Sequence, residues 1–164
     1  MNKEQYVKML SFLRERPRLL SFVLNTQRAI TAAVYLFYPC ILVYLLIFGD
    51  SRFLKVLIVP AVSFALLSAV RYLINAKRPY EVFETPPLNG KKTKGKSCPS
   101  RHTFSVFVIS FVAFYVCRPL GVALSALGLL LAVCRVLCGV HFVRDVLLGA
   151  ACGILCGIVG FYIL

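Results

Sequence analysis

Residues 29–48 read AITAAVYLFYPCILVYLLIF, a run of 20 residues without a charged side chain. A helix needs about 20 apolar residues to cross the hydrocarbon core of a bilayer, so this stretch predicts a membrane-spanning helix. The whole chain has the same character, because 60% of its 164 residues are hydrophobic and only 15% are charged. In ordinary globular proteins about 45–50% of residues are apolar and about 25% are charged. The composition therefore excludes a mainly disordered chain, and the odd number of cysteines, seven, argues against a disulfide-stapled miniprotein.

Four further apolar stretches follow the first one, and only short links separate most of them. They cover residues 53–74, 103–117, 120–140 and 146–164. The last stretch is rich in glycine and alanine, and small residues let helices approach closely in lipid. The sequence therefore predicts an all-α fold, an integral membrane helix bundle with five transmembrane helices.

The N-terminal residues have a different pattern. Between residues 3 and 24, apolar side chains alternate with Lys, Arg and Glu, which predicts an amphipathic helix lying on the membrane interface and interrupted near Pro17. A solvated basic tail is the alternative. We expect two parts, an interfacial N-terminal helix over residues 1–28 and a transmembrane domain over residues 29–164.

Counting the crossings places the chemically active side chains on one membrane face. If each apolar stretch crosses once, the N-terminus and the long polar segment 75–100 lie on the same face, and so does the link near residues 141–145. The residues that this parity brings together are Arg71, Arg78, the segment 98–102, Arg135, His141 and Asp145.

These residues have the chemistry of a phosphoryl site. His141 and Asp145 are four residues apart, which on a helix places both side chains on one side, and a carboxylate can fix the tautomer of an imidazole. Asp145 can instead pair with Arg144 or favour the first turn of a helix. Arginine suits phosphate oxygens through bidentate contacts. Charges inside apolar spans are functional hypotheses by default, although Arg71 and Arg135 lie near span ends, where long side chains can also snorkel to water.

Other chemistries fit less well. Two His and one Asp are too few ligands for a closed zinc site, and the arginines would repel a cation. There is no Gly-x-Ser-x-Gly elbow for a serine hydrolase. The net charge of +13 comes with no nucleic-acid-binding motif, so anionic lipid head groups and phosphate-bearing substrates are the expected partners.

Three ordered blocks of the sequence resemble the signature of the type 2 phosphatidic acid phosphatase superfamily. They are Arg71-x6-Arg78-Pro79, Pro99-Ser100-Arg101-His102 and Arg135-x5-His141-x3-Asp145. The family pattern is Lys-x6-Arg-Pro, Pro-Ser-Gly-His and Ser-Arg-x5-His-x3-Asp. The family includes lipid phosphate phosphatases and shares its site with vanadium haloperoxidases. This chain departs from the pattern at three positions, where it has Arg71 for Lys, Arg101 for Gly and Cys134 for Ser.

The resemblance implies an enzyme that hydrolyses a lipid phosphate without a metal or any other cofactor. His141 would attack phosphorus and form a phosphohistidine, Asp145 would orient it, and His102 would act as acid and then base. Arg71, Arg78, Ser100 and Arg135 would hold the phosphate oxygens. The Arg101 side chain would either add a phosphate or head-group contact or point to water.

We expect the substrate to be amphipathic, with membrane lipids as the surroundings and no obligate protein partner. Phosphatidic acid, phosphatidylglycerol phosphate and polyprenyl phosphates or diphosphates all fit. The alternatives are a non-enzymatic anion- or lipid-binding membrane protein or small transporter, and a haloperoxidase-like enzyme holding vanadate.

Charge predicts the orientation in the cell membrane. Only Arg52, Lys55 and Arg118, three of the 19 Lys and Arg residues, lie on the face opposite the candidate site. The other 16 lie on the face of the candidate site, and four of them belong to the site itself. This leaves 12 Lys and Arg residues on that face against 3 on the opposite face. Because Lys and Arg in short loops favour the cytoplasm, we expect the site on the cytoplasmic face. Many family members face outward, so the outer face is the alternative.

Overall fold

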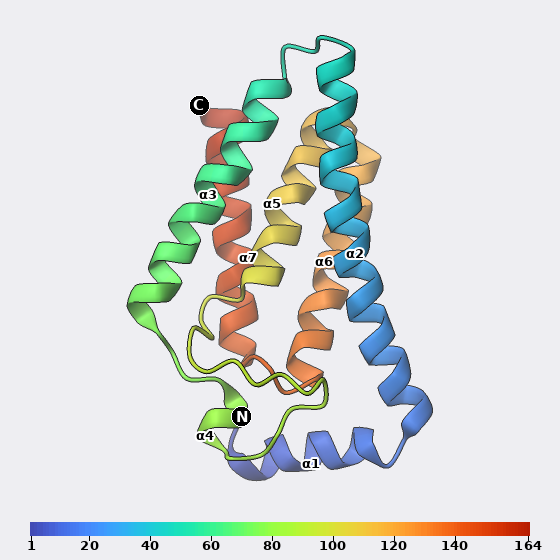
Figure 1. The fold of residues 1–164 in the computed structure, drawn as a ribbon, viewed down its shortest axis with the longest axis vertical. Helices are drawn as coiled ribbons and strands as arrows, with labels where there is room; N and C mark the ends of the chain where they lie inside the picture. Colours follow the sequence, from blue (N-terminus) through green and yellow to red (C-terminus); the bar gives the residue numbers. More distant parts are fainter.

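The computed structural model describes all 164 residues and contains helices and loops but no strand, so the all-α prediction is confirmed. The long helices run side by side along the long axis, and α1 lies across one end of them (Figure 1). In chain order the elements are α1 (Lys3–Arg14), α2 (Pro17–Ile47), α3 (Phe53–Ile74), α4 (Pro79–Val82), α5 (Arg101–Val116), α6 (Arg118–Leu137), α7 (Val143–Ile158) and the π-helical turn η1 (Val159–Ile163).

Four of these segments are long and apolar enough to cross a membrane. They are residues 17–47, 53–82, 118–137 and 143–163. The helix α2 begins at Pro17, 12 residues before the predicted start of the first span, so residues 17–28 continue into the long helix. The remaining apolar helix, α5, has 16 residues and is about 24 Å long, shorter than a bilayer core of about 30 Å.

The short helix α5 is the centre of the bundle. Nine of its 16 residues are buried, and it packs against both α6 and α7. The contact with α7 depends on small residues, as the glycine pattern predicts. A Cβ atom on Gly149 would lie 2.6 Å from the Ser100 carbonyl oxygen, and one on Gly153 would lie 2.8 Å from the Phe104 carbonyl oxygen. Because α5 is enclosed by other helices, its length is not set by contact with lipid.

The N-terminal helix α1 is held against the end of the bundle. It ends before Pro17, where the sequence predicted an interruption. Its apolar side chains Tyr6, Leu10 and Leu13 are buried, and the Tyr6 hydroxyl lies 3.0 Å from the Gly139 carbonyl oxygen. A solvated basic tail is therefore wrong for this segment, which packs beneath the link between α6 and α7.

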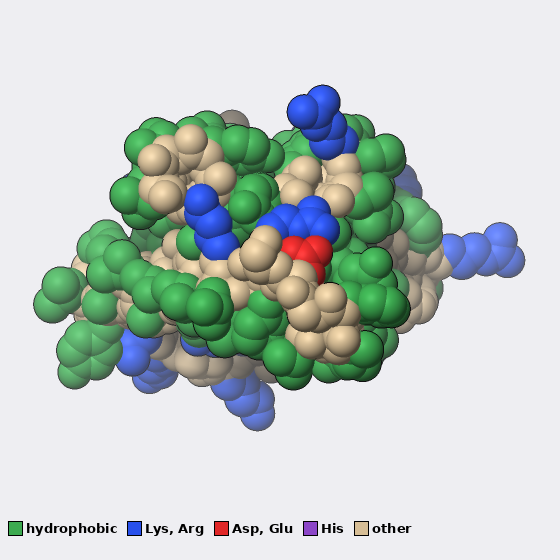
Figure 2. All heavy atoms as spheres, turned by 90° about the horizontal axis from the view of Figure 1, so that it is seen from above, with side chains coloured by type: hydrophobic (Ala, Val, Ile, Leu, Met, Phe, Trp, Pro, Cys, Tyr) green, Lys and Arg blue, Asp and Glu red, His purple; other side chains and the backbone are tan.

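The two ends of the bundle differ in charge. The end that carries the α2–α3 turn is largely hydrophobic, with a few Lys and Arg side chains and one small acidic patch (Figure 2). Asp50 pairs there with Arg52 at 2.6 Å. The opposite end carries α1, α4 and the long polar loop (Figure 1). The candidate residues lie at that end.

Candidate active site

The two arginines of the first block hold the polar loop against the end of the bundle. Arg71, at the end of α3, donates hydrogen bonds to the carbonyl oxygens of Pro99 and Lys96. Arg78 precedes α4, and its side chain donates to the carbonyl oxygens of Gly95 at 3.0 Å, Val140 at 3.2 Å and Lys96 at 3.3 Å. These bonds join the end of α3 to the second and third sequence blocks.

Both arginines are buried within protein rather than extended to water. Arg71 is 7% exposed and Arg78 is 3% exposed, so snorkelling does not explain them. A guanidinium group has five N–H donors. The carbonyl contacts use two N–H donors of Arg71 and three of Arg78. Three donors of Arg71 and two of Arg78 therefore remain for another acceptor. The same side chains can therefore hold the loop and bind an anion.

The third block places a buried imidazole next to a buried carboxylate. His141 is 1% exposed and Asp145 is fully buried, and His141 Nδ1 lies 3.6 Å from Asp145 Oδ2. That oxygen accepts hydrogen bonds from the Phe142 N–H at 3.0 Å and the Ser97 hydroxyl at 2.5 Å. Asp145 thus caps α7 and also faces His141, while the exposed Arg144 lies 3.7 Å from its other oxygen.

His141 is neutral at physiological pH. Burial lowers its pKa to about 4, although the neighbouring Asp145 acts in the opposite direction. With Nδ1 beside Ser97 and Asp145, the other ring nitrogen, Nε2, has no hydrogen-bond partner within the protein. A neutral imidazole with one free nitrogen has the form that a nucleophile needs.

The second histidine is held by the third arginine. Arg135 Nη2 lies 3.3 Å from His102 Nδ1, and Arg135 Nη1 donates to the Gln27 side-chain oxygen at 3.3 Å. Because arginine only donates, His102 Nδ1 must accept, and this assigns the ring proton to Nε2. Arg135 is 6% exposed and its Nε has no partner, so it too is buried rather than snorkelling.

Ser100 and Arg101 differ in their surroundings. Ser100 is fully buried, its N–H donates to the Asp145 carbonyl oxygen at 2.7 Å, and its hydroxyl accepts from Thr103 at 3.1 Å. Arg101 is exposed, and its guanidinium carbon lies 5.6 Å from the centre of the Phe64 ring. The structure therefore gathers the predicted residues at one end of the bundle, with Arg101 at the rim.

Three residues near this site were missed from the sequence. Ser97 touches Asp145, Gln27 touches Arg135, and Lys91 is half-buried with its pKa lowered to about 8 by burial and by the surrounding arginines. Gln27 is an uncharged polar residue just before an apolar stretch, which was a usable signal. Ser97 and Lys91 lie in a lysine-rich loop and had no distinguishing pattern.

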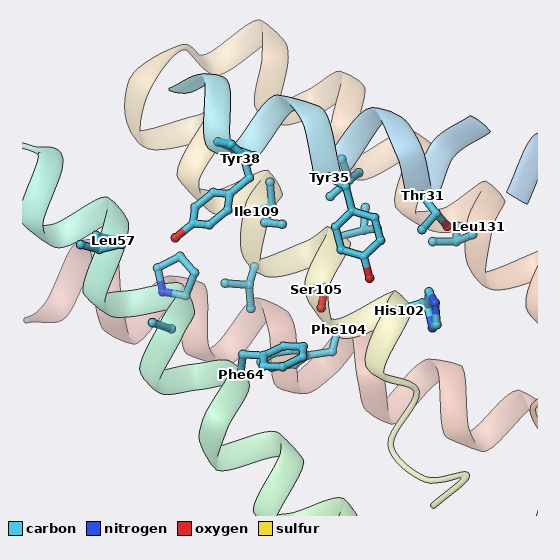
Figure 3. A pocket seen from close by; sticks show the side chains of 16 residues that line it. Thr31, Tyr35, Tyr38, Leu57, Phe64, His102, Phe104, Ser105, Ile109 and Leu131 are labelled. Carbon is cyan, nitrogen blue, oxygen red and sulfur yellow. The ribbon is translucent and has the colours of Figure 1, made fainter. Parts of the chain in front are cut away.

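An apolar groove reaches the site from the side of the bundle. It has a volume of about 370 Å³ and is lined by side chains of α2, α3 and α5, with one more from α6. His102 lies at one end of the groove near Thr31, and Leu57 lies at the other (Figure 3). Pro39 of α2 and Pro60 of α3 also line it. A catalytic candidate thus borders an apolar space between two membrane-crossing helices.

Comparison with known proteins supports one family. The fold is similar to the crystal structure of Aquifex aeolicus LpxE, with a TM-score of 0.71 and 24% identity over 94% of this chain and 93% of that one. It is also similar to a transmembrane PAP2-type phosphatidylglycerolphosphate phosphatase from Bacillus subtilis, with a TM-score of 0.57 and 22% identity over 96% of this chain and 74% of that one. No curated protein sequence matches the chain.

A sequence model of the PAP2 superfamily matches residues 52–164, which contain all three blocks. The match begins just before α3 and includes every helix that contributes a predicted catalytic residue. The chain therefore belongs to the PAP2 superfamily.

Proposed function

We propose that this protein is an integral membrane phosphatase that hydrolyses the phosphomonoester or diphosphate of an amphipathic lipid. The observation that carries the proposal is the position of His102, which belongs to the arginine-lined site and also borders the apolar groove. A lipid can place its chain in the groove and its phosphate among the arginines. The two similar structures are named as a PAP2-type phosphatase and as LpxE, which agrees with a phosphatase.

The reaction begins with attack on phosphorus. His141 Nε2 forms a P–N bond while the P–O bond to the lipid breaks in line with it. When the anionic substrate draws Arg135 to the phosphate, His102 exchanges the Arg135 hydrogen bond at Nδ1 for a proton and gives its Nε2 proton to the leaving oxygen. Water then loses a proton to His102 and attacks the phosphohistidine, so that the P–N bond breaks and inorganic phosphate leaves.

The arginines stabilise the charge of the phosphoryl group during both steps. Arg71, Arg78 and Arg135 retain free N–H donors, and preorganised donors of this kind are the main source of stabilisation in phosphoryl transfer. Guanidinium groups take the place that a metal ion has in other phosphatases. We therefore expect activity to persist in excess chelator and vanadate to inhibit.

Phosphate release from lipid phosphates in detergent tests the reaction. Wild-type protein should release phosphate, His141→Ala and His102→Ala should abolish turnover while still inserting and purifying, and Asp145→Asn should lower kcat by orders of magnitude. Near-normal release by His141→Ala would reject the phosphohistidine mechanism. Activity lost in chelator and restored by Mg²⁺ would indicate a metal-dependent enzyme, and no release from any lipid would favour a binding protein or transporter.

A block in the groove tests the lipid route. Ala61 of α3 lines the groove, so Ala61→Trp should raise KM for a long-chain phosphatidic acid while hydrolysis of a water-soluble phosphate ester continues. Ala126→Trp is the matched control, because Ala126 is exposed on α6 and does not line the groove. If the two variants behave alike on both substrates, the groove does not carry the lipid chain.

The orientation follows from the same proposal. With five spans, α1 would lie in the plane of one membrane interface, where its exposed Lys3 and Lys8 would meet lipid head groups. The excess of Lys and Arg on that side favours the cytoplasm. The site would then draw its substrate from the inner leaflet.

A further inference from the structure

A second cavity, which is polar, lies beside His102. Its volume is about 380 Å³, and Arg28, Arg135, Asn89 and Tyr35 contribute to its lining. No Asp or Glu lines it. The cavity therefore combines two guanidinium groups with neutral hydrogen-bonding groups and contains no group that repels an anion.

Neither arginine of this cavity is neutralised by the protein. The three ion pairs of the chain involve Arg52, His141 and Arg144. Arg135 is 6% exposed and its Nε has no hydrogen-bond partner. Arg28 is exposed at this cavity. An anion in the cavity would give the two guanidinium groups the charge partner that the protein does not supply.

The position of the cavity indicates which part of a substrate it receives. Neither His141 nor Arg71 nor Arg78 lines it, so it extends from the site on the side of His102. In the proposed reaction the leaving oxygen is on that side, opposite the attacking nitrogen. The cavity also shares Thr31 and Tyr35 with the apolar groove, so it lies between the scissile phosphate and the lipid chain.

We propose that this cavity binds a second phosphoryl group, carried by the leaving part of the lipid. The inference rests on the proposed function and narrows its substrate. Two lipid types have this chemistry, a prenyl diphosphate and a phosphatidylglycerol phosphate, in which a phosphodiester lies between the terminal phosphate and the acyl chains. Simple phosphatidic acid lacks the second phosphoryl group, so it would leave Arg28 without an anionic partner.

Matched substrates with one chain test the proposal. Geranylgeranyl diphosphate and geranylgeranyl monophosphate differ only in the second phosphate. We expect wild-type protein to favour the diphosphate in kcat/KM by about 10-fold or more, and Arg28→Gln to remove most of that preference while monophosphate hydrolysis changes by less than about 2-fold. Arg18→Gln is the control, because Arg18 is exposed on the same helix and does not line the cavity.

The two lipid types are separated by a second pair of substrates. Phosphatidylglycerol phosphate and phosphatidic acid with identical acyl chains repeat the comparison. In phosphatidylglycerol phosphate the three carbons of a glycerol separate the two phosphoryl groups, which in the prenyl diphosphate share one oxygen. A preference that Arg28→Gln removes in both pairs means that the cavity accepts either spacing. Loss in one pair alone identifies the lipid that fits. Equal effects of Arg28→Gln on all four substrates, or no effect on any of them, would overturn the proposal.

Binding to an inactive variant separates this proposal from the proposed function. In a His141→Ala background, the affinities for the two geranylgeranyl ligands can be measured by thermal shift in detergent without any turnover. Tighter binding of the diphosphate that disappears on adding Arg28→Gln supports the cavity even if no lipid is hydrolysed. Equal affinities for both ligands reject the cavity even if wild-type protein is an active phosphatase.

Discussion

Removal of one buried hydroxyl should slow the reaction without touching a residue of the three blocks. Ser97 is fully buried, and its hydroxyl donates to Asp145 Oδ2 at 2.5 Å while lying 3.4 Å from His141 Nδ1. In Ser97→Ala the carboxylate oxygen would keep only the Phe142 N–H at 3.0 Å. Asp145 Oδ2 would then be free to move closer to His141 Nδ1, now 3.6 Å away, and would turn the ring out of its alignment.

The size of the effect follows from the bond that is lost. A hydrogen bond to a charged group contributes about 1.5–3 kcal/mol, and each 1.36 kcal/mol corresponds to about a tenfold change in rate. If most of that energy serves alignment, kcat falls by about 10- to 100-fold. KM should change by less than about 3-fold, because Ser97 lines neither the groove nor the polar cavity and makes no hydrogen bond to a phosphate-binding arginine.

The control is a serine of equal burial in the same protein. Ser110 of α5 is also fully buried, and its hydroxyl donates to the Val106 carbonyl oxygen at 2.8 Å, within the helix. Ser110→Ala removes a buried hydroxyl of the same size without touching the site, so it should keep its activity. Thermal unfolding and phosphate release in the same detergent compare the two variants. Equal activity in Ser97→Ala and Ser110→Ala would refute the positioning role.

The pH profile adds a readout that general destabilisation would not produce. The pKa of His141 is lowered to about 4, so the ring is neutral and competent above that pH and becomes protonated below it. Without Ser97, the Asp145 carboxylate interacts more strongly with His141 and raises its pKa toward the ordinary value of about 6.5. The ratio of variant to wild-type kcat/KM should then fall as the pH decreases from 7 to 5, and substrate ionisation cancels in the ratio. A constant ratio over that range would contradict the argument.

Four further predictions concern single residues. Lys91, with its pKa lowered to about 8, is protonated below pH 8 and neutral above it, so competitive inhibition by sulfate should weaken as pH rises through 8 in wild-type protein but not in Lys91→Gln. Gly149→Ala should lower stability by roughly 1–3 kcal/mol in thermal unfolding and reduce activity, because its Cβ would lie 2.6 Å from the Ser100 carbonyl oxygen. Arg101→Gly should raise KM or alter head-group preference with little change in kcat, and unchanged kinetics on every substrate would mean that the exposed side chain only meets solvent. In intact cells, a membrane-impermeant maleimide should label a variant that retains only Cys98 solely after permeabilisation, whereas earlier labelling would place the site outside.

Much of the architecture could be predicted because it depends on additive properties of the chain. Long apolar stretches need lipid or burial wherever they occur. The helices and their order could therefore be predicted from the hydropathy pattern along the chain. The parity of crossings then placed the three blocks at one end, and the structure joins them there through bonds such as that between Arg78 and the Val140 carbonyl oxygen. The start of α2 was mislocated because residues 17–28 are polar enough to resemble an interfacial segment, yet they continue a helix without a break.

The tertiary structure decided which side chains support the site. Ser97 meets Asp145 across 48 residues of sequence, and Gln27 meets Arg135 across 108. Such contacts depend on how two helices are rotated about their axes and how far a loop folds beneath them, and neither hydropathy nor spacing records those quantities. The same holds for Arg28, which in the sequence is one basic residue among 19 and in space lines a cavity without a neutralising carboxylate. The sequence by itself therefore determined the membrane setting and the candidate reacting groups, whereas the supporting contacts and the shapes of the groove and the cavity arose only when the helices packed.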